Sequence, residues 1–268
     1  CDGLESVTIP NTVTQIYGYA FADCRNLKNI NISDSVTVLG ENVFQNDTSI
    51  TEINLPDSIT ALGRGAFSGC NRLKSIVIPD SVTNIGISAF SECKNLESVT
   101  LSKGLEKIGE NAFYNCDSLQ SIEIPKSLKD VYATYDSIYT PNGVFNECSR
   151  LKTIVFEKGS TIIADALFRG CDGLESIVIS DTITQIYGYA FADCKNLKNI
   201  NISDSVTVLG ENAFQNDTSI TEINLPDSIT ALGRGVFSGC DRLKSIVIPD
   251  SVTNIGKSAF SECKNIEI

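Results

Sequence analysis

Hydrophobic residues return to the same relative positions along the chain, and a single unit shows the pattern. Residues 73–78 are rich in β-branched side chains and alternate between apolar and polar near their end, which predicts a short strand. Pro79 lacks a backbone N–H and ends that strand. Residues 81–85 are a second short extended segment, and Gly86 permits a turn. Residues 89–90 then predict one helical turn before the next unit begins.

The unit repeats every 23 residues, and its cysteine marks the period. Twelve positions hold ten Cys and two Asp: Cys1, Cys24, Asp47, Cys70, Cys93, Cys116, Cys148, Cys171, Cys194, Asp217, Cys240 and Cys263. We call this place in the unit the Cys position. Phe stands three residues before each later one: Phe21, Phe44, Phe67, Phe90, Phe113, Phe145, Phe168, Phe191, Phe214, Phe237 and Phe260. One step is 32 residues instead of 23, which indicates an irregular insertion at about residues 132–143.

A longer duplication overlies the short period. Residues 1–98 match residues 171–268 at an offset of 170, with 12 differences among the 98 pairs. The two regular halves therefore carry nearly the same surfaces, and they meet at the irregular centre.

One unit cannot bury its own apolar face, but stacked units cover one another. The sequence therefore predicts a solenoid of stacked 23-residue turns with parallel short strands and a single helical turn per repeat. Parallel strands stack about 4.8 Å apart, so the array should form a rod of roughly 50 Å. Leu, Ile and Val should point inward with Phe and Cys and form ladders through one continuous core.

The consensus Leu-x-x-Ile-x-Ile-Pro-x-Ser-Val-Thr-x-Ile-Gly-x-x-Ala-Phe-x-x-Cys resembles the BspA-like, or Treponema-type, leucine-rich repeat. The resemblance covers nearly the whole chain, so we interpret residues 1–268 as a single leucine-rich-repeat solenoid and as a fragment of a longer array. It implies an extracellular protein attached to a cell surface, of the kind that includes adhesins. Two departures lie just after the insertion: Glu157 stands where Pro is common, and Ser160 stands where Val is common.

Composition narrows the function. The net charge of −12 disfavours nucleic acids and anionic membranes as partners. No apolar run approaches the roughly 18–20 residues of a membrane span, so we expect no direct membrane insertion in this fragment. The chain has no His, which removes Ser-His-Asp triads, Cys-His dyads and zinc sites that need imidazole. We therefore expect no enzyme and no cofactor.

The ten cysteines raise the question of disulfides, which are common in extracellular proteins. All ten occupy one inward-facing column, where parallel side chains keep neighbouring Cβ atoms too far apart for a relaxed disulfide. We expect reduced thiols packed in the core. A metal site is disfavoured, because its ligands must converge on one point and a column does not.

Three surface features are candidate binding sites. The outward strand positions should line the concave face, but they carry no aromatic or Arg side chain, so a solvated face is the simpler interpretation. A row after Pro holds Asp in both halves and Lys103, Lys126 and Lys158 at the centre. Solubility explains that row, and calcium binding is its alternative.

The third candidate is a tyrosine cluster on and beside the insertion. Tyrosine offers a large contact area with a hydroxyl, and it is enriched at binding hot spots. The alternative is that the rings only pack the insertion onto the rod. The candidate ligand-binding residues are Tyr132, Tyr135, Asp136, Tyr139, Tyr187 and Tyr189.

The sequence as a whole predicts a recognition or adhesion module of the cell surface. Its partner would be a protein or glycan on host or neighbouring cells. The alternative is a structural spacer that projects another domain from the surface.

Overall fold

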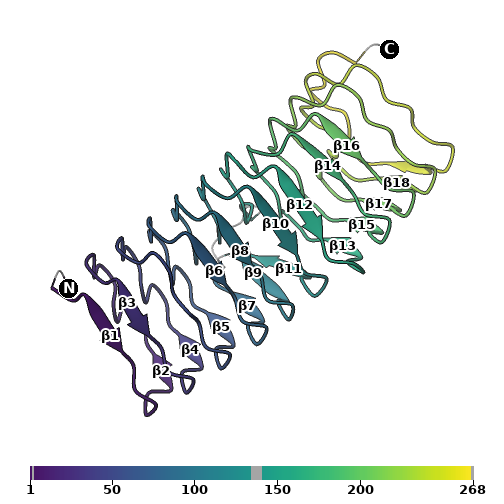
Figure 1. Cartoon of the computed structure of the whole chain (residues 1–268). Coiled ribbons are helices and arrows are strands. Elements are labelled where there is room, and N and C mark those ends of the chain that lie inside the picture. The colour runs from purple at the N-terminus through teal and green to yellow at the C-terminus, as the bar shows by residue number, and fades with distance from the viewer. Residues whose placement is uncertain (2, 134–140, 267–268) are drawn as a thin grey trace.

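The computed structural model describes residues 1, 3–133 and 141–266. The chain winds into turns that stack into an elongated rod, with the N-terminus at one end and the C-terminus at the other (Figure 1). Each turn contributes short extended segments, and segments from successive turns pair in parallel. This is the parallel-strand solenoid that the 23-residue period predicts.

The first extended segment of most turns forms a strand on one flank of the rod. These strands pair in four separate two-stranded sheets, β1·β3, β6·β8, β10·β12 and β14·β16. Their bounds are Ser6–Thr8 (β1), Asn29–Asn31 (β3), Ser75–Val77 (β6), Ser98–Thr100 (β8), Ser121–Ile124 (β10), Thr153–Phe156 (β12), Ser176–Val178 (β14) and Asn199–Asn201 (β16). The register places equivalent residues opposite each other, as in Ile76 and Val99.

The second extended segment forms longer ladders of shorter strands. The strands are Gln15–Ile16 (β2), Val38–Leu39 (β4), Ala61–Leu62 (β5), Asn84–Ile85 (β7), Lys107–Gly109 (β9), Asp130–Tyr132 (β11), Ile162–Ile163 (β13), Gln185–Ile186 (β15), Val208–Leu209 (β17), Ala231–Leu232 (β18) and Asn254–Ile255 (β19). One sheet runs from β2 to β11, and another runs from β13 to β19. The insertion separates these two sheets.

The phenylalanine column forms the centre of the core. Successive rings from Phe21 to Phe260 stack nearly parallel, with centroids 5.1–5.7 Å apart. Those from Phe44 to Phe237 are fully buried. The twelfth ring, Phe156, lies outside the column and meets Phe168 edge-on at 6.2 Å. The predicted ladder is therefore confirmed.

The predicted helical turn is wrong, because the described residues contain no helix. In the turn that ends at Cys70, Gly65, Phe67 and Gly69 donate their backbone N–H groups to carbonyls of the next turn at 2.7–2.9 Å. The residues between them donate to the carbonyl three residues back. Gly65 and Gly69 have φ of +57° and +75°, in the left-handed region. Two left-handed residues per turn prevent consecutive helical dihedrals, so the segment folds as linked tight turns.

The cysteine column lies beside the phenylalanine column, and every cysteine is a free thiol. Most of these thiols donate a hydrogen bond to the carbonyl of a Phe one turn earlier, as Cys70 Sγ does to Phe44 at 3.2 Å. Burial raises the pKa of Cys93 to about 12. A buried thiol with a raised pKa holds little thiolate, and thiolate is the reactive form, so the column should be chemically inert.

We expect alkylation under denaturing, non-reducing conditions to label ten cysteines, detected by mass spectrometry. In the folded protein at pH 8 we expect rapid labelling of the exposed Cys1, while the buried cysteines stay protected. By count alone, the ten cysteines could all pair with a neighbour in the column. Finding five disulfides would therefore contradict the argument that parallel side chains hold neighbouring Cβ atoms too far apart.

Candidate functional site

The period breaks once, between β11 and the residues that begin again at Pro141. Tyr132 ends β11 and pairs with Gly109 of the preceding turn. The next strand of this flank, β13, belongs to the other sheet. Within the described residues the rod therefore has a single seam on this flank, with Tyr132 on one side of it and Tyr187 and Tyr189 on the other.

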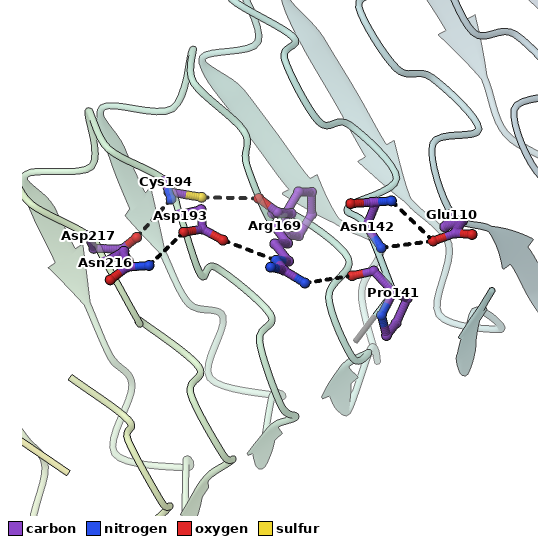
Figure 2. Close-up of polar contacts among 9 residues, drawn as sticks. Glu110, Pro141, Asn142, Arg169, Asp193, Cys194, Asn216 and Asp217 are labelled. Atoms are coloured by element: carbon purple, nitrogen blue, oxygen red, sulfur yellow. Dashed lines mark hydrogen bonds and ion pairs between the residues drawn. The ribbon is translucent and has the colours of Figure 1, made fainter. Parts of the chain in front are cut away.

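Hydrogen bonds attach the C-terminal end of the insertion to both neighbouring turns (Figure 2). On one side, the backbone N–H and the Nδ2 of Asn142 donate to Glu110 Oε2 at 3.0 and 3.4 Å. On the other side, Arg169 Nη1 donates to the carbonyl of Pro141 at 3.2 Å. The insertion thus returns to the rod at a fixed point.

Arg169 makes two further contacts in the next turn. Its Nε donates to Asp193 Oδ2 at 3.1 Å, and its guanidinium carbon lies 5.5 Å from the centre of the Tyr189 ring. Asp193 Oδ1 in turn accepts Asn216 Nδ2 at 2.9 Å. Only a quarter of the Arg169 side chain is exposed. Charge-assisted bonds and a cation–π contact at partial burial together hold this surface in one geometry.

Tyr132 points away from this network. Its hydroxyl donates to the carbonyl of Ile85 at 3.1 Å, two turns toward the N-terminus. Burial raises the pKa of Tyr132. The ring can cross the intervening turn because Gly109 presents no side chain there. The structure therefore does not bring Tyr132 together with the pair Tyr187 and Tyr189.

Tyr187 and Tyr189 lie on the C-terminal side of the seam, and both are partly exposed. Their counterparts in the first half, Tyr17 and Tyr19, are 74% and 59% exposed. Both Tyr189 and Tyr19 have a left-handed φ, near 54° and 60°. Tyr19 and Tyr189 thus share this backbone conformation, but only Tyr189 has the Arg169 guanidinium beside its ring. Three predicted residues, Tyr135, Asp136 and Tyr139, lie outside the described residues.

Comparison with known proteins identifies the repeat. The sequence matches the BspA type leucine rich repeat region, in six copies, over residues 1–86, 63–135 and 138–267. The chain belongs to this family. A leucine-rich repeat protein of known structure from Bacteroides ovatus is 30% identical, with 98% of this chain and 77% of that chain covered and a TM-score of 0.61.

The pneumococcal vaccine antigen PcpA shares the fold at 21% identity. The match covers 96% of this chain and 66% of that chain, with a TM-score of 0.52. No curated protein matches the chain. The BspA type repeat thus accounts for the solenoid, and leucine-rich-repeat solenoids are typically non-enzymatic scaffolds.

The two departures from the BspA type consensus, Glu157 and Ser160, both form hydrogen bonds in the structure. Glu157 Oε2 accepts the backbone N–H of Lys126 at 3.0 Å, and its Oε1 lies 3.3 Å from Lys126 Nζ. The bond from this backbone N–H lowers the pKa of Glu157. Ser160 is buried and donates its hydroxyl to the carbonyl of Glu157 at 2.8 Å. Lys126, the middle lysine of Lys103, Lys126 and Lys158, is therefore ion-paired with Glu157 at the surface.

Calcium binding was the alternative interpretation of the charged row after Pro, and it requires a cluster of oxygen ligands. Within residues 1, 3–133 and 141–266, no group of three or more acidic or Cys side chains is placed to hold a metal ion. In the same residues, no helix is long and apolar enough to cross a membrane.

Sequence reasoning missed the residues that attach the insertion, Arg169 and Glu110. Arg169 stands two residues before its Cys position, where the other BspA type units of this chain carry Ala, Gln, Ser, Asn or Tyr. A column-by-column search for the single charged residue would have found it. Glu110 gave no such signal, because Glu also stands at that place in other units, as at Glu41.

Proposed function

We propose that this chain is a cell-surface recognition module that binds a protein or glycan partner at the seam. The observation that carries this proposal is the Arg169 network, which fixes Tyr189 beside the insertion. The regular turns offer similar surfaces many times, whereas the seam offers one surface once. The proposed contact residues are Tyr132, Tyr135, Asp136, Tyr139, Tyr187 and Tyr189.

Physical arguments support recognition at this place. Tyr supplies contact area at a small cost in entropy, and Arg and Tyr dominate hot spots. The Arg169 contacts hold Tyr189 before a partner arrives, which reduces the cost of binding. The family resemblance favours an extracellular location on the cell surface. The acidic surface disfavours nucleic acid as the partner.

The duplication provides a matched test. A panel of host extracellular-matrix proteins and a glycan array serve as probes. On whichever probe binds, we expect Tyr187→Ser with Tyr189→Ser to weaken binding at least about tenfold, about 1.4 kcal/mol. Changing Tyr17 and Tyr19 to Ser removes the same residues from the same repeat positions far from the seam. That control should bind like the unchanged protein.

The two tyrosines on the insertion are tested in the same assay. Tyr135→Ser with Tyr139→Ser should also weaken binding, with folding verified by circular dichroism. Equal affinity of both seam variants and the control would move the site away from the seam. No saturable binding to any probe would favour a structural spacer instead.

A further inference from the structure

The strand pairing along the first flank is interrupted after each pair of strands, and two of these interruptions lie at equivalent places in the two halves. Strand β3 pairs with β1, but within the described residues no backbone hydrogen bond joins residues 28–32 to residues 51–55 of the next turn. The same interruption recurs between residues 198–202 and 221–225. Among the described residues, pairing is likewise absent between β8 and β10 and between β12 and β14, so the two equivalent places differ from the others in their side chains.

Amide side chains distinguish these two interruptions. Asn29, Asn31, Glu52 and Asn54 stand at the outward positions of the first one. All four are exposed, and none makes a side-chain hydrogen bond in the described residues. The equivalent residues of the second half are Asn199, Asn201, Glu222 and Asn224.

Each interruption carries a shallow hollow. The first has a volume of about 190 Å³ and the second about 180 Å³, and the four side chains of each half line it. From Asn26 to Gly65 the two halves differ only at Val43, which is Ala213 in the second copy. The rod thus presents the same polar hollow twice.

We propose that each hollow binds the hydroxyl groups of a neutral sugar, and that the two hollows together bind one neutral polysaccharide chain. This goes beyond the function proposed above, because it assigns a second surface and a ligand class. A solvated, unoccupied face is the alternative that the experiment below must exclude.

The chemistry of the lining favours a hydroxyl-rich, uncharged ligand. Each Asn amide both donates and accepts, and a sugar hydroxyl does the same. Glu52 accepts only, which suits a hydroxyl donor. The nearby cation Lys28 already lies 3.4 Å from Glu5, so it offers little to an anionic ligand. The four side chains include no aromatic or Arg anchor of the kind that protein hot spots use.

The spacing of the hollows favours a polymer. They lie seven turns apart, or roughly 34 Å at about 4.8 Å per turn. A long chain that occupies both hollows gains avidity, because its second contact is intramolecular. A short oligosaccharide cannot span them and should fill each hollow independently.

The experiment uses the whole chain with immobilised dextran, β-glucan and mannan, and with short oligosaccharides of the polymer that binds. Asn31→Ala with Asn54→Ala removes one hollow, and Asn201→Ala with Asn224→Ala removes the other. We expect each pair to weaken polymer binding at least about tenfold by loss of avidity. Each pair should also reduce the stoichiometry for the oligosaccharide from two to one, and all four changes together should abolish binding.

Ser98→Ala with Thr100→Ala is the matched control, since it alters the equivalent outward residues of β8, which pairs with β6 as β3 pairs with β1 but carries no amide side chain, and it should change nothing. The proposal is overturned if no neutral polysaccharide binds, if one pair removes all binding, or if the control loses as much. Binding only to heparin or only to gelatin would also overturn it, in favour of an anionic or a peptide ligand. Loss in the Tyr187 and Tyr189 variant alone would leave the seam as the site and reject the hollows.

Discussion

Phe90→Ala should lower the free energy of unfolding by about 3–5 kcal/mol. Phe90 is fully buried, and its ring stacks between Phe67 at 5.2 Å and Phe113 at 5.1 Å. The change removes apolar burial, leaves a cavity, and ends two ring contacts. In a solenoid each turn is stabilised by its neighbours, so a defect in the middle also weakens the coupling between the two halves.

Urea unfolding followed by circular dichroism measures this loss. Phe21→Ala is the matched control, because Phe21 is only partly buried and stacks on one ring, Phe44. The control should cost clearly less than the central change. An unchanged midpoint for Phe90→Ala would show that the phenylalanine ladder does not form the core.

The period alone was enough to predict the columns of the fold. An inward Phe or Cys that returns every 23 residues has one economical explanation, a stack of turns, and the structure confirms it. Strand β6 also lies within the predicted segment 73–78. These features were predictable because apolar burial depends on residue type, which the sequence states directly.

The backbone between the second strand and the Cys position was not predictable in the same way. Left-handed residues occur there as Gly65 in one turn but as Ser88 and Tyr189 in others. Their backbone N–H groups bond to the next turn, and no single residue type marks the conformation, although Asn, Asp and Gly are frequent at these positions. The predicted helical turn failed for this reason.

The candidate site was predictable only in part. The insertion and its tyrosines were visible as a break in the period. The contacts of Arg169 with Pro141, Asp193 and Tyr189 depend on how three turns align in space. Such contacts cannot be inferred from spacing. The sequence does show that Arg169 is the one charged residue among the positions two residues before each Cys position.

The two aspartates in the cysteine column should make stability depend on pH. Asp47 and Asp217 are fully buried, and each Oδ1 accepts the backbone N–H of Cys24 or Cys194, at 2.7 and 2.8 Å. Among the described residues, neither Oδ2 has a hydrogen-bond partner. Burial raises the pKa of Asp47 to about 7, from an ordinary value of 3.8, and raises that of Asp217 well above its usual range.

The sign of the effect follows from these pKa values. Below pH 3.8 both folded and unfolded Asp47 are protonated, so it adds no pH dependence. Between about pH 4 and pH 7 the unfolded chain ionises while the folded one keeps its proton, so the free energy of unfolding falls. Above pH 7 the loss from Asp47 approaches its full value of about 4 kcal/mol. The loss from Asp217 continues to higher pH.

Replacing both aspartates by the cysteine of the other turns should remove this loss. We expect Asp47→Cys with Asp217→Cys to unfold at higher urea concentration than the unchanged protein at pH 8, and to converge with it near pH 4. The exposed carboxylates titrate alike in both proteins, so their contribution cancels when the free energy of unfolding of one protein is subtracted from that of the other at each pH. Asp47→Asn with Asp217→Asn keeps the shape and the acceptor for Cys24 and Cys194 but cannot ionise, so it should lose the same pH dependence. If the difference between the unchanged protein and both variants stays constant from pH 4 to pH 8, the buried aspartates do not titrate in this range, and the cysteine column tolerates a buried charge.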